Sequence, residues 1–228
     1  MQRFNGDEFV KGIDTTRSDR RELGIMSLFD KTMFNTLDDS IFNAAKEFAS
    51  VAAKHNVKIN YEDTTWFAIA NCKGKLKGKD INFILWLQVE NRREDMYKWV
   101  IVKADCKQFQ LDPQDNDEMI MIQPNDHEVN FSALNVITNG NDNLITKYTR
   151  KDYEIDQTSV FLSMVYFGIL NIDFVTSLQF VFFQVPDYLF YVQKCVRETT
   201  NSGWLINTFE KKSEVEKMKI YNYVIDKK

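Results

Sequence analysis

The longest apolar stretch of the chain runs from residue 160 to residue 192 and reads VFLSMVYFGILNIDFVTSLQFVFFQVPDYLFYV. A membrane-spanning helix needs roughly 20 apolar residues in a row. Asp173 and Asp187 interrupt the stretch, and the charge-free runs 157–172 and 174–186 are shorter than that. The sequence therefore predicts that this stretch folds into a protein core and does not cross a membrane.

The first part of the stretch has the pattern of a capped helix. Asp156 precedes Thr158 and Ser159, which is typical of a helix N-terminus. The apolar residues that follow surround the helix axis, and a helix of this kind is expected to be buried. We expect it to end at Gly168 or at the turn-like segment 171–173.

Three strands are predicted after this helix, because β-branched and aromatic runs alternate there with turn signals. Pro186 ends the first strand, and Asn201-Ser202-Gly203 supplies the turn before the third. The predicted strands are 178–185, 188–198 and 204–212. Their short connections predict an antiparallel meander.

The first half of the chain has the same order of elements. Apolar residues recur at helical spacing within 37–56, which predicts an amphipathic helix closed by Asn56. Three strand-like runs follow, at 64–74, 80–90 and 96–105, joined by the short polar segments KLKGK and NRRED. Such segments are typical of hairpin loops.

The order helix, strand, strand, strand thus occurs twice, over about 36–105 and 156–210, with a polar, turn-rich region at 108–154 between the copies. A duplication is one interpretation, and one continuous curved sheet built from both halves is the other. We expect the second, within a single domain over 1–228, because neither half offers enough helix to cover its own sheet. The predicted fold class is α+β, with a curved, mostly antiparallel sheet packed against a few helices.

Charge and cysteine content bear on partners and location. The net charge of −4 and the pI of about 5.4 give no overall electrostatic reason to expect nucleic acid. Cys72, Cys106 and Cys195 are odd in number and far apart, which favours a reducing compartment over a disulfide framework. The first residues have no apolar run of signal-peptide length. We expect a cytoplasmic protein; the alternative is an export signal trimmed from this start.

The predicted strands do not separate into one apolar and one charged face, as half-solvated antiparallel strands do. Their second faces carry large amphipathic rings, with polar or charged side chains beside them. A Trp or Tyr ring buries about 150–250 Å², so we expect a cover over it: the other half of the chain, a small ligand or a second subunit. The residues of this mixed face are Trp86, Trp99, Tyr191, Trp66, Gln88, Glu90 and Lys103.

Motifs for catalysis or cofactors are missing from the sequence. His55 and His127 have no Cys or His neighbour at metal-ligand spacing, so we predict no metal site. The chain has no nucleophile elbow, dinucleotide fingerprint or Walker motif, so we predict no cofactor. The lysine-rich segment 73–79 is typical of a solvated hairpin, and a local anion or nucleic-acid contact is the alternative.

The strands YKWVIVKAD and NSGWLINTFE, each within a meander that follows a helix, resemble the α+β rolls of the nuclear-transport-factor-2-like and cystatin-like superfamily. The resemblance covers residues 36–105 and 156–210 and implies a strongly curved sheet that wraps a helix and forms a conical pocket. Members include isomerases, dehydratases and non-catalytic binding or dimerisation modules. The enzymes place an Asp or His deep in the cone, whereas here only boundary residues such as Asp80 and Asp105 occur in the predicted strands.

We therefore predict a non-catalytic binding or protein-interaction module. Its mixed aromatic face would form a cleft or a dimer surface for a small apolar molecule or a protein partner, with Gln88, Glu90 and Lys103 setting orientation. One alternative is an acid–base enzyme of the roll type, isomerase-like or dehydratase-like, acting on a small apolar substrate. The other is a structural homodimer without ligand.

Overall fold

The structure is a computed structural model that describes residues 1–8, 19–34, 39–93, 96–110, 150, 155–198 and 200–225. Its contacts divide the chain into two units, one formed by Met1–Ala104 with Asn171–Lys228 and the other by Asp105–Leu170. The predicted polar region 108–154, with His127, lies outside the described residues except for 108–110 and Arg150. A single domain over 1–228 stays a prediction.

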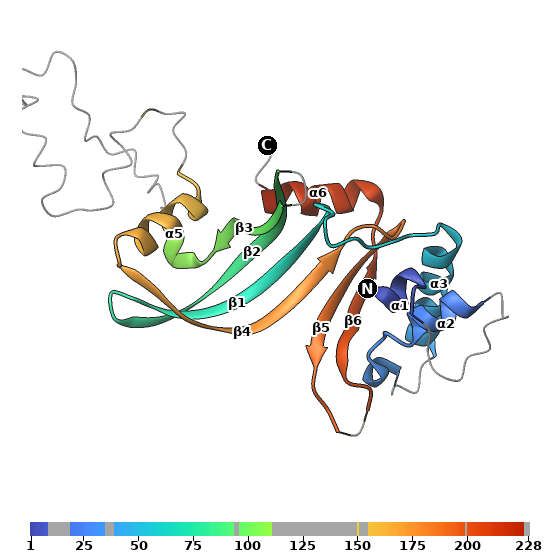
Figure 1. The fold of residues 1–228 in the computed structure, drawn as a ribbon. Helices are drawn as coiled ribbons and strands as arrows, with labels where there is room; N and C mark the ends of the chain where they lie inside the picture. Colours follow the sequence, from blue (N-terminus) through green and yellow to red (C-terminus); the bar gives the residue numbers. More distant parts are fainter. Residues whose placement is uncertain are drawn as a thin grey trace, which may run out of the picture. The chain divides into compact units, whose positions relative to one another are not determined.

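Six strands form one open antiparallel sheet in the order β3-β2-β1-β4-β5-β6 (Figure 1). The two halves of the chain meet between β1 and β4, where Asn71 Nδ2 donates to Ser177 Oγ at 2.8 Å. The predicted α+β class is thus confirmed, with all six strands in one sheet. The strands are β1 (Trp66–Leu76), β2 (Lys79–Arg93), β3 (Met96–Asp105), β4 (Leu170–Phe182), β5 (Tyr188–Cys195) and β6 (Gly203–Lys211).

The hairpin of β1 and β2 turns in two residues. Leu76 pairs with Lys79, and between them Lys77 and Gly78 have φ angles of +50° and +80°. Positive φ at both central positions is the geometry of a type I′ turn, whose twist matches that of the flanking strands. The prediction that KLKGK joins two strands is confirmed.

The helix α5 (Gln157–Tyr166) begins as predicted, because Asp156 Oδ1 accepts the backbone N–H of Ser159 at 2.8 Å. Gly168, with φ +68°, follows its end. The alternative end at 171–173 is wrong, because these residues already lie in β4. The left-handed conformation at Gly168 stops the helix at once, so the chain becomes extended by Leu170.

The prediction that this helix is buried all round is also wrong. Phe161 alone among the residues of α5 is buried, against Phe109 of the short helix η2 (Lys107–Phe109), with ring centroids 5.6 Å apart. Leu162, Val165 and Tyr166 are exposed. An apolar composition therefore indicates burial only where enough neighbouring structure packs around the helix.

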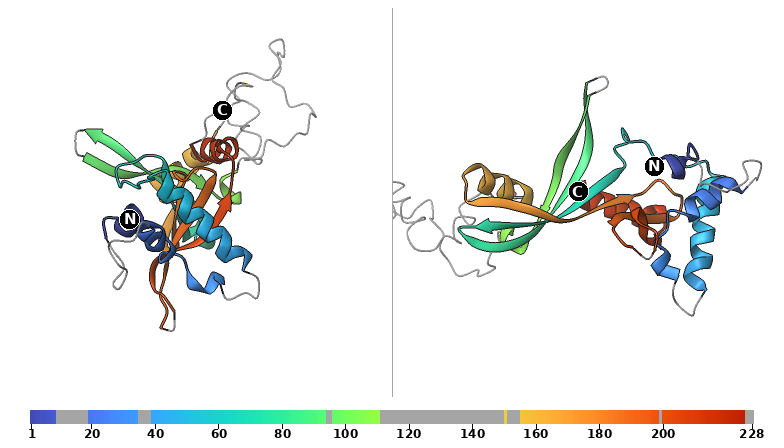
Figure 2. Two further views of the ribbon diagram at one scale, coloured as in Figure 1. Left: turned by 90° about the vertical axis from the view of Figure 1, so that its right-hand side faces the viewer. Right: turned by 60° about the horizontal axis from the view of Figure 1, so that its bottom comes forward.

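The N-terminal helices cover one face of the sheet at its β5–β6 end (Figure 2). These are α1 (Gln2–Asn5), α2 (Arg20–Met26), the 3-10 helix η1 (Lys31–Phe34) and α3 (Ser40–Lys54). Phe48 of α3 sits edge-on to Tyr188 and Phe190 of β5, with centroids 5.3 and 5.2 Å apart. Asn56, with φ +48°, closes α3 as predicted. We call this side, which bears Trp66, Phe182 and Phe190, the groove face.

The opposite face is covered by a helix that the sequence analysis did not predict, α6 (Glu214–Ile225). Its Val224, Ile220 and Tyr221 pack against strand residues that alternate with those of the groove face, and we call this side the α6 face. Lys217 is buried there, and its Nζ donates to Val185 O at 2.8 Å and to Glu214 Oε1 at 2.7 Å. The buried ammonium is thus paired, as burial requires.

The close approach of β1 to β4 depends on a glycine. A Cβ built on Gly74 would lie 2.2 Å from Asn171 O. We expect Gly74→Ala to lower the free energy of unfolding by about 2–3 kcal/mol, because the two strands must separate to admit the methyl group. Chemical denaturation measures the change. Lys73→Ala, at the exposed neighbouring position, is the control, and equal effects of the two changes would contradict this account.

Candidate functional site

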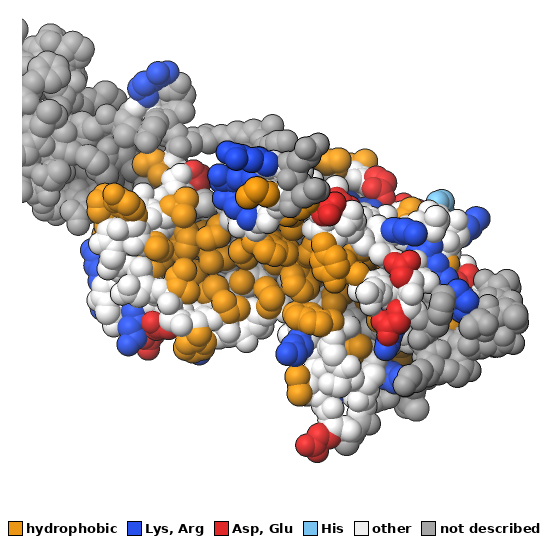
Figure 3. Space-filling model, in the orientation of Figure 1, with side chains coloured by type: hydrophobic (Ala, Val, Ile, Leu, Met, Phe, Trp, Pro, Cys, Tyr) orange, Lys and Arg blue, Asp and Glu red, His pale blue; other side chains and the backbone are white. Residues whose placement is uncertain are grey.

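An open groove of about 400 Å³ lies on the groove face. Strands β1, β3, β4, β5 and β6 supply its floor and one wall, and the N-terminal segment and the loop before β1 supply the other wall. Figure 3 shows hydrophobic side chains gathered over the middle of the sheet. The residues that line the groove are Met1, Phe4, Leu28, Ile59, Tyr61, Trp66, Trp99, Phe180, Phe182, Phe190, Val192, Trp204 and Ile206.

A row of rings in mutual contact forms the groove. The Trp66 ring lies edge-on to Trp99, with centroids 5.0 Å apart, and stacks on Phe182 at 5.2 Å. Phe180 contacts Trp66, Trp99 and Trp204, the last at 5.1 Å. Each ring fixes the orientation of its neighbour, so the aromatic wall is formed without a ligand.

The rings change from buried to exposed along this row. Trp66 is buried, whereas Trp99 and Trp204 are 43% and 44% exposed and Tyr61 is 67% exposed. Trp66 Nε1 donates to Asn60 O at 3.2 Å, while neither Trp99 nor Trp204 has a hydrogen-bond acceptor for its indole N–H among the described residues. The groove therefore offers apolar surface with two hydrogen-bond donors at its open side, and none of its lining side chains is charged.

The sequence-predicted residues separate into different environments. Trp66 and Trp99 lie together in the groove. Trp86 and Tyr191 lie on the α6 face, in the apolar cluster that includes Phe67, and burial raises the pKa of the Tyr191 hydroxyl. Gln88 also faces α6, since its Nε2 donates to Tyr221 Oη at 3.1 Å.

The two predicted charged residues make contacts outside the groove. Glu90 forms an ion pair with Arg92 at 3.0 Å and a longer one with Lys98 at 3.7 Å. Lys103 Nζ donates to Tyr223 O at 3.0 Å and lies 3.8 Å from the centre of the Tyr223 ring. Neither residue lines the groove.

Sequence reasoning missed six aromatic residues of the groove, which are Phe4, Tyr61, Phe180, Phe182, Phe190 and Trp204. Alternation within β4 places Phe180 and Phe182 on one side, and this signal was present in the sequence. Trp204 pairs across from Lys194 of β5, and only the register of that pair reveals its face. Tyr61 lies in the loop before β1, where periodicity predicts no face.

An ion pair between the buried Asp30 and the partly exposed Arg197 lies beside Leu28, which lines the groove. Asp30 is buried, and both of its oxygens accept hydrogen bonds from Arg197, one of them at 2.7 Å. These bonds hold the pKa of the Asp30 carboxyl well below its usual range. The backbone beside it pairs with β6, because Asp30 N donates to Ile206 O at 2.9 Å and Ile206 N donates to Leu28 O at 2.8 Å. The pair thereby fixes two lining residues.

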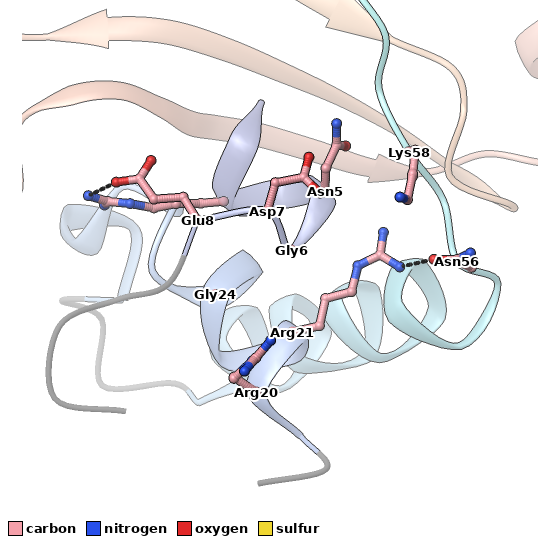
Figure 4. A pocket seen from close by; sticks show the side chains of 10 residues that line it. Asn5, Gly6, Asp7, Glu8, Arg20, Arg21, Gly24, Asn56 and Lys58 are labelled. Carbon is pink, nitrogen blue, oxygen red and sulfur yellow. Dashed lines mark hydrogen bonds and ion pairs between the residues drawn. The ribbon is translucent and has the colours of Figure 1, made fainter. Parts of the chain in front are cut away.

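A second, polar pocket of about 280 Å³ lies between α1, α2 and the end of α3 (Figure 4). Arg21 of α2 points across it and donates to Asn56 Oδ1 at 2.7 Å and to Val57 O, and burial lowers the pKa of its guanidinium. Asn5 exchanges two hydrogen bonds with the backbone of Ile59, at 2.8 and 2.9 Å. This network positions Phe4 and Ile59, so we interpret the pocket as support for the groove.

The described part of the chain offers little support for other kinds of functional site. No three His, Cys, Asp or Glu side chains gather as metal ligands there, and His55 lies at the C-terminal end of α3. Cys72, Cys106 and Cys195 are free thiols. None of the described helices combines the length and the apolar character needed to cross a bilayer. Comparison of the chain with protein-family models, curated proteins and solved structures finds no match.

The Asp30–Arg197 pair should make stability depend on pH. A carboxyl whose pKa is depressed in the folded state contributes stability above its unfolded pKa, about 3.9, and loses it as the pH falls through the folded pKa. We expect Asp30→Asn to lower the melting temperature by roughly 5 °C at pH 7. The gap to the unmodified protein should shrink as the pH falls below about 3.9.

Thermal melts followed by circular dichroism at pH 7 and at lower pH measure this gap. Glu198→Gln, at an exposed carboxyl, is the control and should leave the melting temperature unchanged at each pH. A gap between Asp30→Asn and the unmodified protein that stays constant as the pH falls would contradict the role given to the ion pair.

Proposed function

We propose that this chain is a non-catalytic binding protein whose aromatic groove takes up a small, apolar, uncharged molecule. The observation that carries the proposal is the groove itself, which is walled by rings and has no charged side chain in its lining. Its volume of about 400 Å³ lies within the range of small-molecule sites. A charged ligand group would lose its hydration there and find no side chain of opposite charge.

The exposed indoles supply the driving force for binding. Covering the exposed part of one Trp ring, about 100 Å², is worth about 2–3 kcal/mol at the usual coefficient for apolar area. Trp99 and Trp204 lie on either side of Phe180, so one flat or extended ligand can cover both rings at once. Their indole N–H groups can donate to a polar atom at the ligand's outer end.

Family resemblance supports a pocket of this kind. In the nuclear-transport-factor-2-like and cystatin-like rolls a curved sheet and a helix enclose a cone, and here α1 and strands of the sheet line one groove. The enzymes of that superfamily have an Asp or His deep in the cone. The most buried rings here are those of Phe4, Trp66, Phe182 and Phe190, and no described lining residue is an acid or a histidine. Binding is therefore better supported than acid–base catalysis.

N-Phenyl-1-naphthylamine, an uncharged apolar dye whose fluorescence rises in apolar surroundings, tests the groove. We expect the protein to bind the dye, and we expect Trp99→Ala and Trp204→Ala each to weaken binding by about tenfold or more, because each removes one of the exposed indole rings that the dye would cover. Fluorescence titration gives the dissociation constants. Circular dichroism of each variant shows whether the fold is retained.

Tyr166→Ala is the matched control, since Tyr166 is a strongly exposed aromatic residue that does not line the groove. It should leave dye binding unchanged. If the dye fails to bind, or if it binds folded Trp99→Ala and Trp204→Ala as tightly as the unmodified protein, the groove is not the binding site.

A further inference from the structure

The first part of β4, residues 171–178, has an unpaired edge. On one side β4 pairs with β1, but on the other side β5 pairs only with Gln179–Phe182. Figure 1 shows the hairpin of β5 and β6 turning away from the rest of β4. No described residue takes up the backbone N–H and C=O groups that this edge presents.

Half of the side chains along this edge are apolar, and those of residues 171–176 are exposed to solvent. Ile172, Phe174 and Val175 are 43%, 55% and 53% exposed, and Asp173 is the one charged residue of the segment. An exposed, apolar edge strand is a template for pairing with another strand. Strand addition to an exposed sheet edge is a recurring mode of protein recognition.

The two outer edges of the sheet are protected by devices that β4 lacks. The edge of β6 is occupied by the Leu28–Asp30 segment, which bonds to both backbone groups of Ile206. The edge strand β3 carries Lys98 and Lys103, and charged lysines on an edge oppose pairing with another chain. The apolar edge of β4 is therefore an exception within the same sheet.

We propose that this edge pairs with the same edge of a second copy of the chain. Strand pairing about a two-fold axis perpendicular to the sheet is antiparallel and puts each residue opposite one on the same face, so the two residue numbers must add to an even number. The axis then passes midway between the two copies of one residue. We place it at Val175, which gives seven pairs over 172–178.

Side-chain chemistry selects this register. With the axis at Val175, Ile172 lies opposite Leu178 of the second copy, and Asp173 lies opposite its Ser177. Ser177 Oγ already accepts a hydrogen bond from Asn71 at 2.8 Å and has no described acceptor for its own proton. Its hydroxyl can therefore donate to the Asp173 carboxylate across the interface, and the symmetry makes this bond twice.

Neighbouring registers are less favourable. An axis one residue towards the N-terminus, at Phe174, puts the Asp173 carboxylate opposite Val175, and one further on puts two Asp173 carboxylates opposite each other. An axis at Thr176 would require Gln179, which is already paired with Gln193 of β5. Seven residue pairs bury less area than a standard interface, so we expect dissociation constants in the micromolar range.

Cross-linking and mass measurements test the register and the assembly together. We expect Val175→Cys to form a disulfide-linked dimer on mild oxidation, because two residues on the axis face each other directly. Phe174→Cys should form much less, since residue 174 lies opposite residue 176. The unmodified protein, with Cys195 as its least buried thiol, shows the background.

Sedimentation velocity from about 1 µM to about 500 µM should show a monomer–dimer equilibrium. Val175→Lys should raise its dissociation constant by about tenfold or more, since two ammonium groups would meet at the axis. Val196→Lys, at an exposed valine just after β5, is the matched control and should leave dimerisation unchanged.

A monomer throughout this range overturns the proposal, as does a dimer that Val175→Lys leaves intact. Preferential cross-linking through Phe174→Cys would overturn the register. These outcomes are independent of dye binding in the groove, so either proposal can fail while the other holds. If Val175→Lys does not fold, the conservative Val175→Cys still decides the question.

Discussion

The ring of Phe190 in β5 is the contact on which the rest of the architecture depends. It stacks on Phe182 of β4 at 5.0 Å and on Phe4 of α1 at 5.6 Å, and it meets the edge of Phe48 of α3 at 5.2 Å. One buried side chain thus joins two strands to two helices that are distant in sequence. Since such aromatic pairs prefer defined geometries, this contact orients the helices as well as holding them.

The groove continues this aromatic core outwards. From Phe190 the contacts pass to Phe182 and Trp66, which are buried, and then to Trp99 and Phe180. The N-terminal helices cover Phe190 and Phe182 but leave Trp99 exposed. Core and candidate site are therefore built from one type of packing, and the site begins where the helical cover ends.

Much of the fold could be predicted from the sequence, because strands, turns and caps are set by neighbouring residues. The Asp156 cap and the turn at Lys77-Gly78 are examples. The site was less predictable, because the face of a ring depends on strand register. Trp86 pairs with Ile69 and so lies on the α6 face, while Trp99 meets Trp66 on the other. Alternation within single strands led to the prediction that Trp86 and Trp99 share one face. The helix α6, which covers Trp86, was not predicted.

The order of elements along the chain has a consequence for synthesis on the ribosome. The strands that bear Phe67, Val181 and Leu189 are all made before α6, which alone of the described helices covers these residues. This face of the nascent sheet is therefore uncovered until α6 has been synthesised. During that interval its exposed apolar surface favours aggregation and misassembly, and docking of α6 removes that exposure.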